Sequence, residues 1–119
     1  MQWTVDLYPI FKAEFLELPE SVQDQLLKSA RLLVDFGPSL GRPHADTLSG
    51  SKHTNMKELR FYAEDGVWRV AFAFDPDRKA ILLVAGDKSG VSKDRFYKQL
   101  IQKADARFDE HLKTLTRRS

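Results

Sequence analysis

Hydrophobic residues recur along the chain with two different periods. Residues 2–8, "QWTVDLY", alternate polar and apolar side chains of β-prone types, which predicts a strand. Apolar residues three and four positions apart then predict two helices, in residues 9–18 and 19–36, and each segment starts with a proline, which is tolerated at the first helical position. A long final helix is predicted from about residue 93 by one apolar stripe: Phe96, Leu100, Ala104, Phe108, Leu112 and Leu115.

The middle of the chain predicts strands. Residues 37–55 are rich in Gly, Pro and Ser and have no period, so we expect a loop there, with a short strand at "ADTL". Residues 57–74 predict two strands, "DPDRK" predicts a turn, and "AILLVAGDK" predicts a fourth, more buried strand. The order is strand, two helices, three strands and helix. We therefore expect one α+β domain over residues 1–119 with a small antiparallel sheet.

The two strands in residues 57–74 predict a hairpin. Asp65-Gly66 fits the central positions of a type I′ turn, because both positions need positive φ. This turn pairs Arg60 with Ala71. Alternation then predicts two faces. The core face carries Leu59, Phe61, Trp68, Val70, Phe72 and Phe74, and the other face carries Glu58, Arg60, Tyr62, Arg69, Ala71 and Ala73.

The second face combines two arginines on diagonal positions of neighbouring strands. Like charges this close repel each other unless an anion lies between them. Glu58 or Glu64 is one source of that negative charge, and the face is then a polar surface with internal salt bridges. The other interpretation is a shallow basic floor that binds a phosphate, because the guanidinium fork matches phosphate oxygens. The pattern leaves both interpretations open for Arg60 and Arg69.

Two further residues fall near this face if the fourth strand places Ile81 and Leu83 in the core. Lys88 then emerges on the side of Arg60 and Arg69, unless it is an ordinary solvated lysine at a strand end. Tyr97 lies one turn into the final helix and near that strand end. The alternative role of Tyr97 is half-buried packing beside Phe96.

Composition narrows the class of protein. The 119 residues include no cysteine, which excludes disulfides, zinc–thiolate sites and thiol nucleophiles. No apolar run reaches the length of a membrane span, and the N-terminus lacks the order of a signal peptide, so we expect a cytoplasmic protein without a membrane partner. Residues 1–36 carry a net charge of −3 and residues 37–119 carry +5. This asymmetry permits a polyanionic partner.

The sequence contains no recognisable metal or cofactor motif. His44, His53 and His111 have no metal-ligand spacing and no accompanying carboxylate cluster, so we expect neither a metal site nor a cofactor. There is no nucleophile-elbow motif and no Gly-rich phosphate loop. His53, just before the strand that carries Arg60, is the one histidine that merits a test.

Four segments together resemble a known family. The runs "LGRPHADTLSGSKHTNMKELR", "WRVAFAFDP", "LLVAGDKSG" and "RFYKQLIQKADARFDEHL" are similar to the HigB-like, phage-derived toxins of the RelE/ParE superfamily, and the resemblance covers nearly the whole chain. It implies a small RelE-like α+β domain that acts as the toxin of a type II toxin–antitoxin system. The implied activity is metal-independent cleavage of mRNA on the ribosome. The implied protein partner is a cognate antitoxin with a helix-turn-helix domain.

The resemblance also implies site residues. Arg60 matches the arginine of the family's "K-E-L-R" strand, and Arg69 matches the arginine after the aromatic residue of the next strand. Lys88 matches a basic residue at the end of the last strand, and Lys57 matches the lysine of the first motif, although alternation turns it toward the core. Tyr97 matches loosely a C-terminal tyrosine, since the segment "SGVSKDRF" intervenes.

In this mechanism the 2′-OH of the RNA attacks the neighbouring phosphate, so the enzyme needs a base, an acid and cations. Arg60 and Arg69 suit the stabilisation of charge, while Lys88, Tyr97 or, less well, His53 and Lys57 would move protons. To act as a base at neutral pH, a tyrosine needs its pKa lowered by nearby positive charge, which the two arginines are expected to supply. We expect four basic residues of the last helix to dock on ribosomal RNA: Lys93, Lys98, Lys103 and Arg107.

Two other functions fit the same sequence. One is a ParE-like protein that inhibits DNA gyrase without catalysis, since one fold serves both activities. The paired arginines favour the nuclease, because a gyrase inhibitor needs no surface that binds a phosphate. The other is a binding module or inactive toxin whose arginines form salt bridges alone.

Overall fold

The computed structural model describes residues 2–117. Its regular elements alternate much as the hydrophobic pattern predicts, and the helices begin at or beside the two prolines. They are β1 (Thr4–Leu7), α1 (Pro9–Leu16), α2 (Glu20–Phe36), a short 3-10 helix (Gly37–Ser39), β2 (Ala45–Thr47), β3 (Met56–Ala63), β4 (Gly66–Phe74), β5 (Lys79–Asp87) and α3 (Lys93–Arg117). The α+β class is confirmed, as is the short strand within the long loop.

The five strands form one sheet in the order β1-β5-β4-β3-β2. Three of the four strand pairs are antiparallel, but β1 runs parallel to β5, with Val5 opposite Ala80. The predicted antiparallel sheet is therefore a mixed sheet. A parallel neighbour requires a long crossover connection, and here α1, α2 and the β3–β4 hairpin all lie between the two strands in the sequence.

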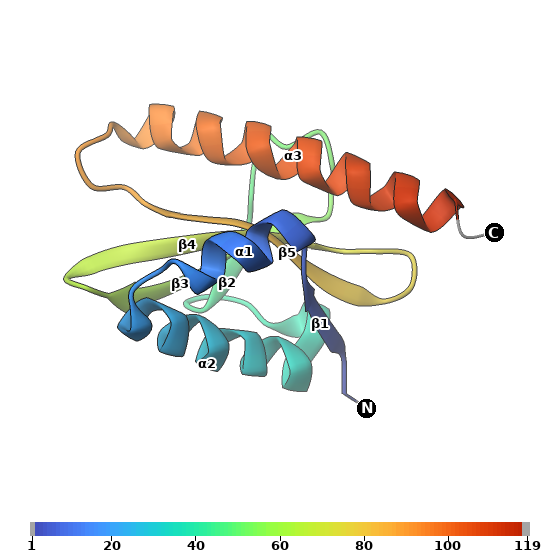
Figure 1. The fold of residues 1–119 in the computed structure, drawn as a ribbon, viewed down its shortest axis with the longest axis horizontal. Helices are drawn as coiled ribbons and strands as arrows, with labels where there is room; N and C mark the ends of the chain where they lie inside the picture. Colours follow the sequence, from blue (N-terminus) through green and yellow to red (C-terminus); the bar gives the residue numbers. More distant parts are fainter. Residues whose placement is uncertain (1, 118–119) are drawn as a thin grey trace.

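Helices cover both faces of the sheet. In Figure 1, α3 runs along one face and α2 along the other, with α1 beside β5. The prediction that one face of the hairpin is core and the other open is therefore wrong in part. Ala71 and Ala73, on the arginine face, are completely buried. Their small side chains leave room for α3 to pack closely over β4, and only the end of this face near Arg60 stays open.

The hairpin turn lies one residue earlier than predicted. Glu64 and Asp65 are its central residues, with φ of 51° and 60°, and Ala63 pairs with Gly66. Arg60 consequently lies directly opposite Arg69 instead of diagonally. The faces are unchanged, because the partner of each residue moves by two positions. The pairing of eight residues of β3 with β4, and not the local Asp-Gly preference, therefore sets the turn.

A bulge in β5 sets the position of α3. Ala71 pairs with Val84 while the next residue, Phe72, pairs with Leu82, so Leu83 has no partner in β4. Arg107 of α3 donates from Nη1 to the Leu83 carbonyl oxygen across 2.7 Å. The bulge changes the alternation of β5, so that Ile81 lies opposite Ala73, on the arginine face, and not on the predicted core face.

The same bulge affects the predicted position of Lys88 beside Arg60 and Arg69. Gly86 pairs with Arg69, so the even-numbered residues at the end of β5 share the face of Arg69. Lys88 follows β5 directly and is exposed. Its place beside the arginines stays a prediction, and the alternation that now favours it comes from the bulge and not from a core position of Ile81.

Candidate functional site

Arg69 is held by the first turns of α3. Its Nε donates to the Tyr97 hydroxyl oxygen across 2.7 Å, and its Nη1 donates to the Val67 carbonyl oxygen across 3.3 Å. Its guanidinium carbon lies 5.5 Å from the centre of the Phe96 ring and 5.6 Å from that of Tyr97. These contacts keep a half-buried cation in one orientation beneath the helix.

Glu58 connects the two arginines. It is 1% exposed, and its Oε1 accepts a hydrogen bond from Arg60 Nε at 2.6 Å and another from the Tyr97 hydroxyl at 2.9 Å. Within residues 2–117 its second oxygen, Oε2, is buried and has no hydrogen-bond partner. Glu58 thus supplies the negative charge that the salt-bridge interpretation expected. Its free oxygen leaves an acceptor that the internal contacts do not use.

The pKa of Tyr97 is raised above its ordinary value. Burial of the phenol is the largest cause, and the charge and hydrogen bond of Glu58 add to it, while Arg69 acts in the opposite direction. The two arginines lower this pKa as expected, but desolvation and the carboxylate outweigh them, so the net lowering that a base role needs is absent. Tyr97 keeps its proton at neutral pH. The hydrogen bond to Glu58 also raises the pKa of Arg60.

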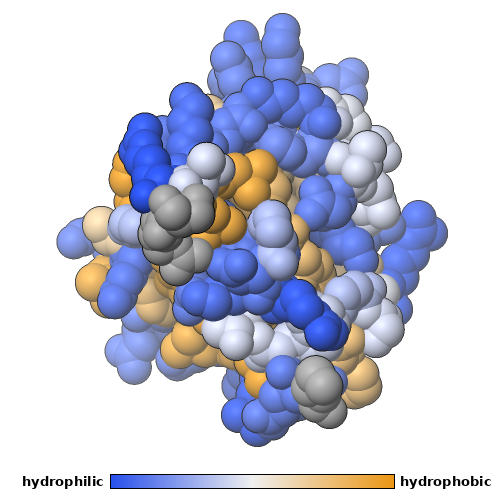
Figure 2. Space-filling view, turned by 90° about the vertical axis from the view of Figure 1, so that its right-hand side faces the viewer, coloured by the Kyte–Doolittle hydropathy of each residue, from blue (hydrophilic) through white to orange (hydrophobic). Residues whose placement is uncertain are grey.

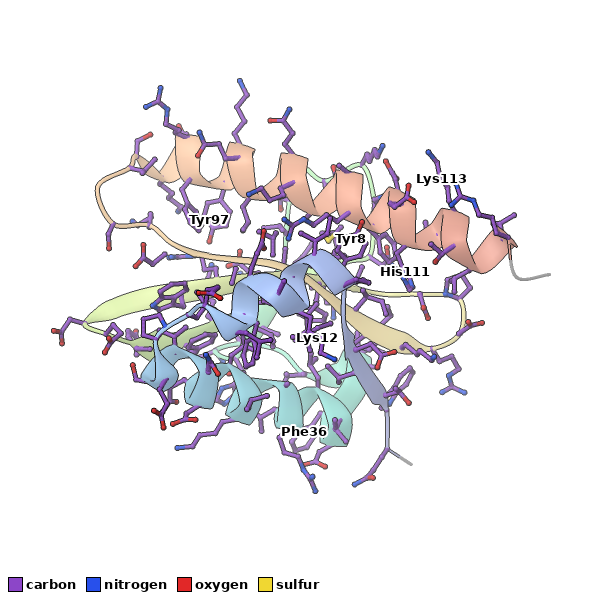
Figure 3. All side chains as sticks on the ribbon, in the orientation of Figure 1. Tyr8, Lys12, Phe36, Tyr97, His111 and Lys113 are labelled. Carbon is purple, nitrogen blue, oxygen red and sulfur yellow. The ribbon has the colours of Figure 1, made fainter. Side chains whose placement is uncertain are left out.

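A hollow of about 270 Å³ opens above this group, between β3, α3 and the loop after β2. Arg60, 42% exposed at the side chain, forms part of its wall. In Figure 3, Tyr97 lies between α3 and the sheet, at the end of the helix opposite to His111. The hollow is lined by Thr47, Leu48, Ser49, Glu58, Arg60, Lys93 and Tyr97.

The structure brings together some of the predicted site residues and separates others. Arg60 and Tyr97 hydrogen-bond to Glu58, Arg69 hydrogen-bonds to Tyr97, and Lys93 lines the same hollow. Lys57 does not join them: it pairs with Phe72 on the other face of the hairpin, and its Nζ donates to the Pro38 carbonyl oxygen across 3.1 Å.

The other basic residues of α3 differ in whether their side chains are available to bind RNA. Lys98 and Lys103 are exposed, as docking on RNA requires. Arg107 is not available for that role, because its side chain is 11% exposed and forms a two-point ion pair with Glu14, at 2.8 and 2.7 Å. We therefore assign Arg107 to the packing of α3 against α1.

Sequence reasoning considered Glu58 as a counter-charge alone. The signal for a larger role is its place two residues before Arg60 on a strand, since alternation puts both side chains on one face. What the alternation does not contain is the arrival of α3 and Tyr97 above that face. No sequence pattern marked Ser49 and the neighbouring loop residues as part of a site.

The His44 carbonyl oxygen accepts a hydrogen bond from the Arg60 amide across 2.9 Å, whereas the His53 and His111 side chains bind other carboxylates. His53 Nε2 is 2.8 Å from Asp109 Oδ1, and His111 Nε2 is 2.8 Å from Asp75 Oδ2. In the described part of the chain no three His, Asp or Glu residues are grouped to hold a metal ion. Among the helices described, none is long and apolar enough to cross a membrane.

A larger hollow, of about 770 Å³, lies between β1, α1 and the C-terminal half of α3. Tyr8, Lys12 and His111 belong to its lining and lie close together in Figure 3. Figure 2 shows orange apolar patches broken by polar residues on the side of the molecule where α3 ends. This hollow shares no residue with the Glu58 group.

Comparison with known proteins identifies the family of the chain. Residues 13–109 match the family model described as "Phage derived protein Gp49-like (DUF891)". Two curated relatives from Mycobacterium tuberculosis carry the names "Putative toxin HigB2" and "Putative toxin HigB3". The first is 40% identical over 92% of this chain and 54% of its own length, so the chain spans about half of that protein. The second is 42% identical over 91% of this chain and 92% of its own length.

The fold also matches a solved structure, a mutant of Escherichia coli toxin RelE in the free state. The TM-score is 0.58, and the match covers 87% of this chain and 97% of the RelE chain. Sequence identity is 13%, so this likeness concerns the fold. From the family match and the two relatives, the chain belongs to the phage-derived Gp49-like family and is similar to HigB toxins, and its fold is like that of RelE.

Proposed function

We propose that this protein is the toxin of a type II toxin–antitoxin pair and that it cleaves mRNA on the ribosome. The observation that carries the proposal is the Tyr97 hydroxyl, which lies in hydrogen-bond contact with a buried carboxylate and with an arginine. One proton acceptor, one proton donor and two cations around a hollow are the groups that RNA cleavage by 2′-OH attack requires. The family membership supports the same activity.

In the proposed reaction the 2′-oxygen attacks phosphorus and the bond from phosphorus to the 5′-oxygen breaks. Glu58 takes the proton of the 2′-OH after Arg60 turns from the carboxylate to the substrate phosphate and opens Glu58 to the hollow, and Tyr97 gives its proton to the departing 5′-oxygen. The products are a 2′,3′-cyclic phosphate and a 5′-OH. Glu58 then returns its proton to Tyr97 through the 2.9 Å hydrogen bond that joins them. The raised pKa of Tyr97 suits this acid role, because the phenol is protonated before the reaction.

The arginines stabilise the negative charge on the phosphorane oxygens. Arg60 is exposed enough to meet a phosphate, and Arg69 is fixed before the substrate arrives. Preorganised cations of this kind need no rearrangement during the reaction. Lys93, which lines the hollow, and the exposed Lys98 and Lys103 are proposed to hold RNA phosphates. Lys88 is a further proposed contact to the backbone of the substrate.

The ribosome is proposed to complete the site. The hollow is open and small, so it does not by itself bend RNA into the in-line geometry that 2′-OH attack needs. An mRNA already held by the ribosome would supply that geometry. A cognate antitoxin with a helix-turn-helix domain would restrain the toxin in the cytoplasm of the cell.

The test is primer extension on a defined mRNA, incubated with the protein in the presence and absence of ribosomes. Cuts that need ribosomes, and that disappear in Arg60→Ala and Arg69→Ala, are the expected result. Arg31→Ala is the matched control, because this arginine lies on α2 and its side chain is 69% exposed. Circular dichroism verifies that each variant is folded.

Intact mRNA under both conditions overturns the nuclease. An assay of DNA supercoiling by gyrase then tests the non-catalytic inhibitor. Equal cleavage by Arg69→Ala and Arg31→Ala would leave a nuclease but remove the proposed site.

A further inference from the structure

A second hollow adjoins the Glu58 hollow at Tyr97, which lines both. Its volume is about 500 Å³, and it is lined by Gly50, Asp94, Tyr97, Lys98, Ile101 and Gln102. The α3 residues in this group recur at intervals of three and four, so they share one face of the helix. The loop after β2 forms the opposite wall of both hollows, through Ser49 in one and Gly50 in the other. Together they form one groove between this loop and α3.

The loop wall of the groove is fixed to the helix. Ser51 Oγ donates to Asp105 Oδ1 across 2.5 Å, and the Lys52 amide donates to Asp105 Oδ2 across 3.1 Å. Lys52 also forms an ion pair with Asp109, which accepts a second contact from His53. Four contacts over three consecutive residues hold the loop at a set distance from α3. The groove is therefore present before any ligand binds.

The second hollow differs chemically from the first. Ile101 gives it an apolar wall, and Gln102 adds an exposed side-chain amide with both donor and acceptor groups. Asp94 places a carboxylate in the lining, which disfavours a phosphate there. A nucleobase fits this combination, because it has apolar faces and an edge of hydrogen-bonding groups.

The spacing of the cations supports a strand of RNA along the groove. Lys93 lines the first hollow and Lys98 lines the second, with Tyr97 common to both. Five residues of an α-helix rise about 7.5 Å along its axis, so the two lysines are offset along the helix, each at its own hollow. Phosphates on either side of one nucleotide would each meet a cation.

We propose that the second hollow binds the base of the nucleotide next to the scissile phosphate, and that Gln102 reads the edge of that base. The inference rests on the proposed function. Gln102 is thus a specificity-determining residue, and the choice of cleavage site depends partly on this protein and not on the ribosome alone.

The experiment maps the cuts made by the wild-type protein, Gln102→Ala and Gln99→Ala on ribosome-bound mRNA that contains all four bases at every codon position. Gln99 is the matched control, because it is an exposed glutamine of the same helix and lies outside the groove. We expect Gln102→Ala to lower cutting at the preferred base roughly tenfold relative to the other sites, as loss of a two-point amide–base contact does. Gln99→Ala should keep the wild-type pattern.

Each outcome separates the two claims. If the wild type cuts and Gln102→Ala keeps the same relative cutting at every site, this inference is overturned and the nuclease stands. If the wild type makes no cuts, the proposed function fails and this inference fails with it. Thermal unfolding of both glutamine variants should match the wild type, since both side chains are exposed.

Discussion

The Tyr97 hydroxyl lies 2.9 Å from Glu58 Oε1, so a phenol of α3 and a carboxylate of β3 share one hydrogen bond. The two residues are 39 positions apart in the sequence, and α3 brings them together by packing over the sheet. The contact places a proton donor beside a buried acceptor, with a cation on either side. Several measurable properties of the protein depend on this arrangement.

The first prediction concerns the titration of Tyr97. Glu58→Gln removes a negative charge that raises the pKa of Tyr97, so this pKa should fall in the variant. Absorbance titration of the tyrosines measures the change, and Tyr97→Phe identifies which transition belongs to Tyr97. Tyr62→Phe is the control, because Tyr62 is 80% exposed and its replacement should leave the Tyr97 transition unchanged. An unchanged high transition in Glu58→Gln would contradict the prediction.

The same shift affects stability at high pH. A folded-state pKa above the unfolded value means that the folded protein holds this proton more tightly. The stabilisation is complete below the unfolded pKa, near 10, and is lost as pH rises through the folded pKa. Urea unfolding is measured at a pH below this range and at a pH above it. Raising the pH should lower the free energy of unfolding less in Tyr97→Phe than in the wild type.

The second prediction concerns the ion pair of Arg107 and Glu14. Arg107→Ala should lower the free energy of unfolding by about 2–4 kcal/mol, because it leaves the Leu83 carbonyl of the bulge without its side-chain partner and removes the link from α3 to α1. Arg31→Ala, at an exposed ion pair, should change it by less than about 1 kcal/mol. Urea unfolding measures both variants, and equal losses would refute the structural role of Arg107.

The ion pair also predicts a pH dependence. The hydrogen bonds that the Glu14 carboxylate accepts from Arg107 lower the pKa of Glu14. The contribution to stability is therefore present above the unfolded pKa of a glutamate, near 4.3, and is lost as pH falls through the lower folded value. Arg107→Ala should lack this part of the acid-induced loss, which urea unfolding at a series of acid pH values would reveal.

The third prediction concerns Asp75 at the β4–β5 turn. Its carboxylate is fully buried and accepts hydrogen bonds from the amides of Asp77 and Lys79, at 2.9 and 3.0 Å, and from His111 at 2.8 Å. Asp75→Ala should lower the unfolding free energy by about 3 kcal/mol, because it removes the acceptor for all three groups. Asp24→Ala, at an exposed position of α2, is the control and should change it by roughly 0.5 kcal/mol at most.

The fourth prediction compares two glycines. Gly37 ends α2 with φ of 56°, and a Cβ there would overlap the Trp3 ring. Gly37→Ala should therefore destabilise the fold by roughly 2 kcal/mol or more. Gly41→Ala should have little effect, since a Cβ at Gly41 would meet no atom within 4 Å. A thermal melt of each variant decides the matter, and similar melting temperatures would show that Trp3 moves aside at little cost.

The local pattern of the chain was sufficient to predict the order of elements, the α+β class and the shared face of Arg60 and Arg69. These features follow from the period of side chains along one helix or one strand, which neighbouring residues determine. The pattern and the similarity to the family also singled out Arg60, Arg69 and Tyr97, and their role in a site remains a prediction.

Tertiary structure alone decided the rest, because it depends on residues far apart in the chain. The hairpin register, the parallel placement of β1 and the bulge at Leu83 result from pairing across the sheet. The raised pKa of Tyr97 results from burial beneath α3 and from a carboxylate on another element. Alternation within β3 placed Glu58 beside Arg60, but only the packing of α3 over that face turned a salt bridge into a candidate proton-transfer pair.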